Sequence, residues 1–169
     1  MINDGMSMKD EISLGVGKAI QDVIGMRGIF EAKLFDKFGN LKDSRKIFNT
    51  VTTLCHKMAA DRILAAPAVI SPGWMELGTG TGQTAASTTL ATYIVASRTA
   101  LDSKTRGANA IVTMICTFGA GVGTGVITEA GIFNVVTQNT TDLLTYADFA
   151  AVNKLAADSL VVTWTLTFA

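Results

Sequence analysis

Two glycine-rich segments have the composition of a phosphate-binding loop, residues 78–82 and 119–125. A dinucleotide-binding fingerprint requires a third glycine three positions after the second, and this chain has Gln83 and Thr124 there. Neither segment ends in the Gly-Lys-Ser/Thr of a P-loop, and both lie between expected strands rather than before a helix. We therefore expect tight turns or bulges in which glycine supplies a positive φ, and no nucleotide or other cofactor.

The only histidine, His56, follows Cys55 in a segment with helical spacing. Neighbouring residues of a helix diverge by about 100°, so these two side chains do not face each other as base and nucleophile. One histidine and two distant cysteines, Cys55 and Cys116, do not form a ligand set with zinc spacing. We expect no metal site and two buried thiols, with a disulfide as the alternative.

Carboxylates are the remaining candidates for acid and base chemistry in the second part of the chain. Six lie beyond Arg62: Glu76, Asp102, Glu129, Asp142, Asp148 and Asp158. Their spacing alone brings no two of them together, and Glu76 with Glu129 stays open as a glycosidase pair without positive support. Because no nucleophile, base or metal constellation is present, we expect no catalytic residues and no enzymatic activity.

The charges of the chain are balanced, with 14 basic and 14 acidic residues. A chain without a basic excess lacks the attraction that dominates binding to phosphate backbones, so nucleic acid is not an expected partner. No run of about 18 or more apolar residues occurs, and the N-terminus carries both signs of charge instead of a basic patch before an apolar run. We expect neither a membrane-spanning segment nor a signal peptide.

Charge and threonine divide the chain near residue 62. Residues 1–62 hold 18 of the 28 charged residues, whereas all 22 threonines lie at Thr50 or later. Threonine together with glycine, alanine and valine is typical of strands and tight loops, which predicts an all-β second part. The length of 169 residues suits one domain, and 49% hydrophobic with only 17% charged residues predicts that some apolar surface meets other subunits.

Residues 1–28 form an expected N-terminal arm. Its apolar residues recur at helical spacing: Ile12, Val16, Ile20 and Val23. Gly15 and Gly17 each weaken a helix there by about 1 kcal/mol relative to alanine. Two interpretations remain open, an arm that orders against a neighbouring subunit or virion protein through these four residues, and a terminal helix folded back on its own domain.

Residues 29–169 are expected to form the main domain. From Gly28 onwards, Phe30, Ala32 and Leu34 alternate with charged residues, and a turn follows at 38–41, which predicts an opening strand and the start of a hairpin. Residues 47–64 have near-helical apolar spacing and predict one helix packed across the sheet, ending before Pro67.

After Pro72, short apolar segments separated by glycine-rich or polar loops predict strands at 74–77, 93–99, 110–118, 126–136, 143–152 and 159–168. The last of these alternates so strictly that it predicts a half-buried strand, joined to its predecessor by a turn at 153–158. Short connections favour antiparallel pairing. The expected fold is mainly β, an antiparallel, jelly-roll-like β-sandwich with one packed helix.

Several segments together resemble small β-rich virion proteins of tailed bacteriophages, which include capsid decoration, head-fibre and tail-associated components. The segments are Met75-Glu76-Leu77-Gly78-Thr79-Gly80-Thr81, Thr88-Thr89-Leu90, Arg98-Thr99-Ala100-Leu101, Phe118-Gly119-Ala120-Gly121, Thr128-Glu129-Ala130-Gly131-Ile132-Phe133, Val152-Asn153-Lys154 and Asp158 to Leu166. The resemblance covers roughly residues 29–169. Related sequences tend to have glycine where this chain has Leu155, and the arm lies outside the resemblance.

The resemblance implies a non-enzymatic structural protein located in the virion and assembled in the cytoplasm of the host bacterium. A capsid decoration (cement) protein is the first expectation, with the major capsid protein or another virion protein as partner and a homo-oligomer, a trimer favoured, as the assembled form. The alternative is a neck, head-fibre, tail-fibre or baseplate component that binds a host receptor or sugar. An exposed concave patch with Tyr93, Tyr146 or Trp74 beside carboxylates would favour the sugar binder.

Overall fold

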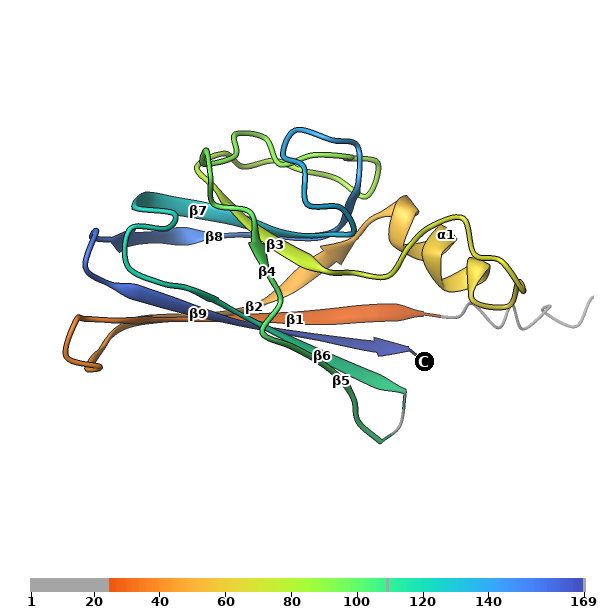
Figure 1. Ribbon diagram of the computed structural model, residues 1–169, viewed down its shortest axis with the longest axis horizontal. Helices are drawn as coiled ribbons and strands as arrows, with labels where there is room; N and C mark the ends of the chain where they lie inside the picture. Colours follow the sequence, from red (N-terminus) through yellow and green to blue (C-terminus); the bar gives the residue numbers. More distant parts are fainter. Residues whose placement is uncertain (1–24, 109, 169) are drawn as a thin grey trace, which may run out of the picture.

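The computed structural model describes residues 25–108 and 110–168 (Figure 1). Within these ranges the chain forms nine strands and one helix. In chain order they are β1 (Met26–Phe35), β2 (Leu41–Val51), α1 (Thr53–Asp61), β3 (Trp74–Gly78), β4 (Thr99–Ala100), β5 (Ser103–Arg106), β6 (Ile111–Phe118), β7 (Gly125–Phe133), β8 (Leu143–Lys154) and β9 (Ser159–Phe168). The described chain is therefore mainly β, as expected.

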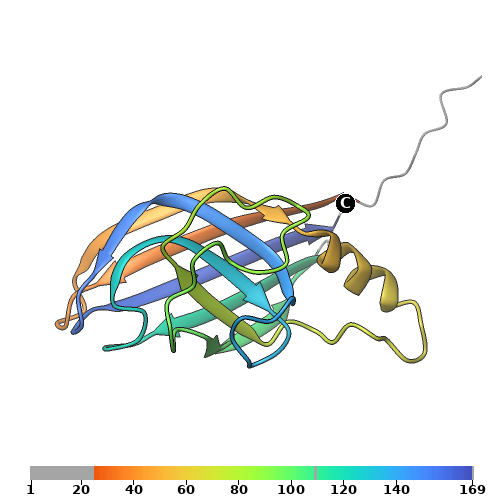
Figure 2. The ribbon, with the colours of Figure 1, turned by 90° about the horizontal axis from the view of Figure 1, so that it is seen from above.

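All nine strands belong to one antiparallel sheet with the order β4-β3-β7-β8-β2-β1-β9-β6-β5. The sheet curls over at the joint between β2 and β8, where only Thr50 with Tyr146 and Val51 with Thr145 are paired. Beyond this joint the two strands separate, and the Arg45 guanidinium donates to the carbonyls of Ala150 and Ala151 at 3.1 Å each. The curl places the layer of β2, β1, β9, β6 and β5 (the β1 layer) opposite the layer of β4, β3, β7 and β8 (the β7 layer) (Figures 1 and 2).

The main core lies between the two layers. Alternate residues of β1, β6 and β9 point into it because successive side chains of a strand point to opposite faces. Phe30 stacks on Phe149 of the other layer at 4.8 Å between ring centroids and meets Trp164 edge-on at 5.0 Å. Trp164 is fully buried, so the strict alternation of residues 159–168 does mark a strand with one buried face.

The helix is shorter than the expected 47–64. Residues 47–51 belong to β2, where the apolar side chains that fit helical spacing also fit strand alternation. Buried Thr52 then begins the helix, because its Oγ1 accepts from the Cys55 amide at 3.3 Å. Cys55 and Met58 form the buried face of α1, and the helix ends at Asp61, before Pro67.

Most expected strands are confirmed, with one exception. The segment expected as a strand at 93–99 is a loop in which Tyr93 alone bridges to Gly78 before β4 begins. Ala96 has a φ of +58°, which a continuous strand does not allow, and the short strand β5 was not expected. β1 begins at Met26, so the expected arm boundary at residue 28 falls inside it.

Two long loops, residues 79–98 and 134–142, cover the outer face of the β7 layer (Figure 1). Beneath them lies a second, smaller core of Leu90, Phe133, Leu143 and Tyr146. The part of the β7 layer beneath these loops is thus buried on both faces. Among the described residues, no comparable loop covers the outer face of the β1 layer (Figure 1).

Candidate functional site

The fold brings Glu76 and Glu129, the candidate glycosidase carboxylates, to the same outer face of adjacent strands. Glu76 pairs with Gly131, and Glu129 pairs with Gly78, two residues further along each strand. Both side chains are buried beneath the loops, at 1% and 0% relative exposure. Their carboxylate oxygens accept hydrogen bonds from other groups of the chain, so neither carboxylate is placed to reach a substrate.

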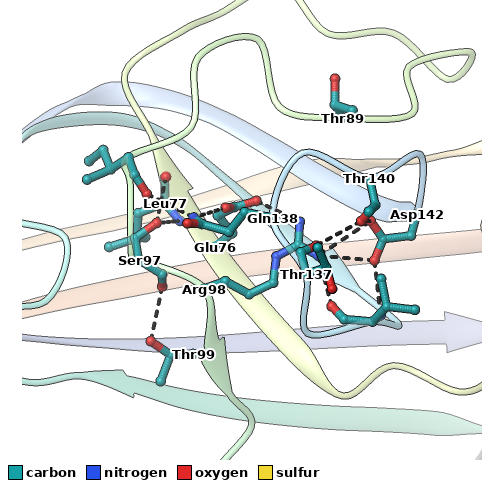
Figure 3. A network of polar contacts seen from close by, with 12 residues as sticks. Glu76, Leu77, Thr89, Ser97, Arg98, Thr99, Thr137, Gln138, Thr140 and Asp142 are labelled. Atoms are coloured by element: carbon teal, nitrogen blue, oxygen red, sulfur yellow. Dashed lines mark hydrogen bonds and ion pairs between the residues drawn. The ribbon is translucent and has the colours of Figure 1, made fainter.

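Glu76 belongs to a buried network around Arg98 (Figure 3). The Arg98 guanidinium donates to Glu76 at 2.8 Å and to Asp142 at 3.1 Å, and it lies 3.6 Å from the centre of the Phe133 ring. The Arg98 side chain is 2% exposed. Gln138 donates to the Glu76 carboxylate and to the Ile94 carbonyl, so the network joins both covering loops to β3.

Glu129 has no cation partner among the described residues and is held by backbone amides. Its carboxylate accepts from the amides of Gly80 at 2.9 Å, Thr92 at 2.8 Å and Ala91 at 3.1 Å. A Cβ atom at Gly80 would lie 2.7 Å from the carboxylate. The segment 78–82, whose composition suggests an anion-binding loop, therefore binds an anion that belongs to the chain itself.

The second glycine-rich segment forms the turn from β6 to β7, and the expectation of positive φ is confirmed. Gly121, Gly123 and Gly125 have φ angles of 81°, 61° and 134°. Lys154, fully buried, donates to the carbonyl of Gly119 at 2.8 Å. Burial lowers the pKa of the Lys154 ammonium, and nearby Asp158 partly offsets that effect.

The histidine and the two cysteines do not meet. His56 lies exposed on α1, whereas Cys55 and Cys116 are free, buried thiols, so the disulfide alternative is excluded. Burial raises the pKa of Cys55 to about 11 and, with the charge of Asp102, that of Cys116 to about 12. Within residues 25–108 and 110–168, no three His, Cys, Asp or Glu side chains lie close enough to hold a metal ion.

The aromatic residues considered for sugar binding pack inward. Tyr146 is 6% exposed and its hydroxyl donates to the Gln83 carbonyl. Trp74 and Tyr93 are partly buried against the second core. These contacts leave none of the three as part of an exposed aromatic patch.

The outer face of β5, β6 and β9 is made of uncharged side chains. Its outward side chains are Ser103, Thr105, Ile111, Thr113, Ile115, Thr117, Val161, Thr163, Thr165 and Thr167, which we call the Thr/Ile face. These ten positions carry no charged residue, and all except exposed Thr105 are half-buried by contact with neighbours. At ordinary sheet spacing the face covers roughly 350 Å².

Apolar residues continue this face onto β1 and β2. Ile29 lies beside Thr165 in the sheet and is 37% exposed, and Phe48 lies beside Ile29 and is 81% exposed. Charged residues flank these two apolar side chains on β1 and β2. Arg27 precedes Ile29 and lies beside Thr167. Further along, Glu31 pairs with Lys33 at 3.2 Å, and Lys46 lies opposite Glu31. The Thr/Ile face thus has a charged border on one side.

Such a face suits contact with another protein. Depletion of charge is the compositional mark of interface cores, and an exposed apolar patch with a polar rim marks an interaction site. Threonine, isoleucine and valine are stiff at χ1, so they lose little side-chain entropy when a partner covers them. The sequence pattern predicted β6 and β9 but not β5, and only the register places the ten outward side chains side by side.

The residues predicted to bind a partner, Ile12, Val16, Ile20 and Val23, lie outside the described residues. No helix in the described part of the chain is long and apolar enough to cross a membrane. Comparison with protein-family models, curated proteins and solved structures gave no match.

Proposed function

We propose that the chain is a non-enzymatic structural protein of a tailed-bacteriophage virion, and that it is a capsid decoration protein that stabilises the shell. The Thr/Ile face carries this proposal, because it offers another protein an uncharged, pre-ordered sheet surface. The resemblance of residues 29–169 to phage virion proteins supports the choice of the virion as its location.

The distribution of charge also supports a structural role. Arg98 pairs with both Glu76 and Asp142 in the interior, and Glu129 is bound by backbone amides. These carboxylates, which could otherwise act as acids or bases, therefore hold the loops in place. The proposal therefore assigns no catalytic residues.

In this role several copies associate through the Thr/Ile face and the adjoining Ile29 and Phe48. A stable interface buries about 800 Å² on each partner, more than the roughly 350 Å² of the Thr/Ile face, so the border residues of β1 and β2 join the contact. Closed symmetry, with a trimer favoured, keeps such a contact from continuing into fibres. The finer fold assignment, a jelly-roll-like β-sandwich, is supported by the single core that the two layers share.

The alternative is a neck, fibre or baseplate component with receptor or sugar binding. The inward packing of Tyr146, Trp74 and Tyr93 gives that alternative little support. A receptor site on the covering loops would need other side chains than these aromatics.

The test is the copy number and position of the chain in purified particles, by quantitative mass spectrometry together with electron microscopy. Hundreds of copies spread over the shell are expected for a decoration protein. About a dozen or fewer at a vertex or tail would replace decoration by the neck, fibre or baseplate alternative. Absence from particles purified from the producing cells would overturn the virion role itself.

A further inference from the structure

An apolar groove of about 490 Å³ lies at the end of the molecule where α1 meets the strand termini. Its walls are Met26 at the start of β1, Phe168 at the end of β9, and Met58, Ala59, Ala60 and Ile63 of α1 and the turn after it. Figure 2 shows α1 beside the end of β9 and the start of β1. The groove is separate from the Thr/Ile face and from the buried carboxylates.

The groove presents apolar side chains to solvent. Ile63 is 87% exposed, and Met58, at 7% exposure, connects the groove to the main core. A large aliphatic side chain that stays in water does not gain the free energy of burial. An apolar segment that covers Ile63 and Phe168 would recover part of it.

The chain itself supplies such a segment next to the groove. Met26 is part of the groove wall, and Gly25 directly precedes it in the sequence. The N-terminal arm is therefore joined to the domain at the groove. The apolar positions Ile12, Val16, Ile20 and Val23 fall on one side of a helix, and twelve helical residues span about 18 Å. Glycine at position 25 permits the reversal of direction that a return to the groove requires.

Charge does not oppose this occupant. Residues 12–23 contain one acidic residue, Asp22, and one basic residue, Lys18, so their charges balance. At the rim, Arg62 donates to the Val69 carbonyl at 2.8 Å, and the Asp61 carboxylate accepts from the Val69 amide at 2.8 Å. Both charged groups at the end of α1 thus have partners within the described chain.

We propose that residues 12–23 form an amphipathic helix that packs into this groove of their own chain through Val16, Ile20 and Val23. Direct covalent connection at Met26 gives the segment an effective concentration in the millimolar range, which a second copy reaches only in concentrated solution. Of the two interpretations of the N-terminal arm, this is the one in which it folds back. The inference does not depend on the proposed virion role, and its test uses the isolated full-length chain.

Disulfide trapping tests the proposal directly. Ile63→Cys is combined in turn with Val16→Cys, Ile20→Cys and Val23→Cys, and the matched control pairs Ile63→Cys with Gln21→Cys on the opposite side of the predicted helix. Oxidised glutathione is the oxidant. The native thiols of Cys55 and Cys116 interfere little, because burial raises their pKa to about 11 and about 12.

The expected result is a monomeric, internally crosslinked chain that forms about 10-fold or more faster for at least one of the three pairs than for the Gln21 control. A disulfide-linked dimer as the main product would show that a second copy fills the groove and would overturn the proposal. Equal rates for all four pairs would overturn it as well.

Amide hydrogen exchange gives an independent measurement without new cysteines. Residues 12–23 of the unmodified chain should be protected, and Ile63→Asp should raise their exchange rates about 10-fold or more. Ile63 lies outside α1 and is largely exposed, so this variant leaves the core intact. Val95→Asp, on a loop residue that is 77% exposed, is the control and should leave the rates unchanged. Unprotected amides in the unmodified chain, or protection that survives Ile63→Asp, would contradict the proposal.

Discussion

Arg98 shows how one side chain holds two loops. It supplies the only cation in contact with Glu76 and Asp142 among the described residues, and both carboxylates lie in the interior. Removing one partner of a buried ion pair leaves the other charged and desolvated, which is far more costly than the loss of a surface pair.

We predict that Arg98→Met lowers the free energy of unfolding by about 3–5 kcal/mol, since methionine fills similar space without the charge. Urea denaturation followed by circular dichroism measures the loss. Arg106→Met, at an exposed position on β5, is the control and should change stability by less than about 0.5 kcal/mol. Similar stabilities for the two variants would mean that the network does not hold the loops.

Gly80 is required for a different reason, the close approach of its backbone to Glu129. A Cβ atom there would lie 2.4 Å from the Ala91 Cβ and 2.8 Å from the Thr92 amide nitrogen. We predict that Gly80→Ala destabilises the protein by about 1–3 kcal/mol through overpacking.

Gly119→Ala is the matched control for Gly80→Ala. A Cβ atom added at Gly119 would meet no other atom within 4 Å, and the φ of this glycine is not in the left-handed region. The thermal midpoint of Gly119→Ala should therefore stay close to that of the unmodified chain. Equal midpoints for the two alanine variants in differential scanning calorimetry would show that the close approach of Gly80 to Glu129 and Ala91 is not required.

At the scale of elements, the Lys42–Asp158 pair joins the start of β2 to the turn between β8 and β9. The Lys42 ammonium donates to the Asp158 carboxylate at 2.6 Å, and the Leu155 amide donates to it at 2.9 Å. The hydrogen bond from Lys42, followed by that from Leu155, lowers the pKa of Asp158. The carboxylate therefore stabilises the fold in its charged form.

A group whose pKa is lower in the folded state stabilises the protein above its unfolded pKa, about 3.9 for aspartate, and loses that contribution as the pH falls through the folded value. We predict that Asp158→Asn is less stable than the unmodified chain at pH 7 and that the difference shrinks steadily below about pH 4. Urea midpoints at pH 7, 5, 4 and 3 measure it. Asp102→Asn, at an exposed position, serves as the control. A difference that is independent of pH would contradict the assignment.

At the scale of the whole molecule, its two outer faces differ. Loops and a second core cover the β7 layer, whereas the Thr/Ile face of the β1 layer is left to a partner in the proposed function. A charge placed at the centre of this face would be desolvated on association and would have no partner there.

We predict that Ile115→Lys, at the centre of the Thr/Ile face, converts the expected homo-oligomer to monomer while the thermal midpoint of the monomer changes little. Multi-angle light scattering after size-exclusion chromatography measures the mass. Thr124→Lys, on the exposed turn before β7, is the control and should leave the mass unchanged. A monomeric unmodified chain, or an oligomer that persists in Ile115→Lys, would show that the face does not mediate self-association.

The sequence by itself determined the strands whose local pattern is unambiguous. Residues 159–168 alternate strictly, and the glycines at 121, 123 and 125 predict turns, because side-chain periodicity and φ preference act within a few residues. The predictions of a helix at residues 47–51 and of a strand at residues 93–99 are wrong, because the apolar spacing of these segments suits more than one local structure. Pairing with β1 makes residues 47–49 part of a strand. In the loop that begins at Tyr93, the Ala96 amide donates to Gln138 and not to a neighbouring strand.

Only the tertiary structure decided what the polar residues do. Glu76, Glu129 and Arg98 are separated by tens of residues, and the register of β3 with β7 together with the covering loops determines their partners. The register of β6 with β9 likewise gathers threonines from distant segments onto one face. Pairing register and loop closure are long-range properties, since they depend on which strands pair. The pattern within one segment does not identify its partner strand.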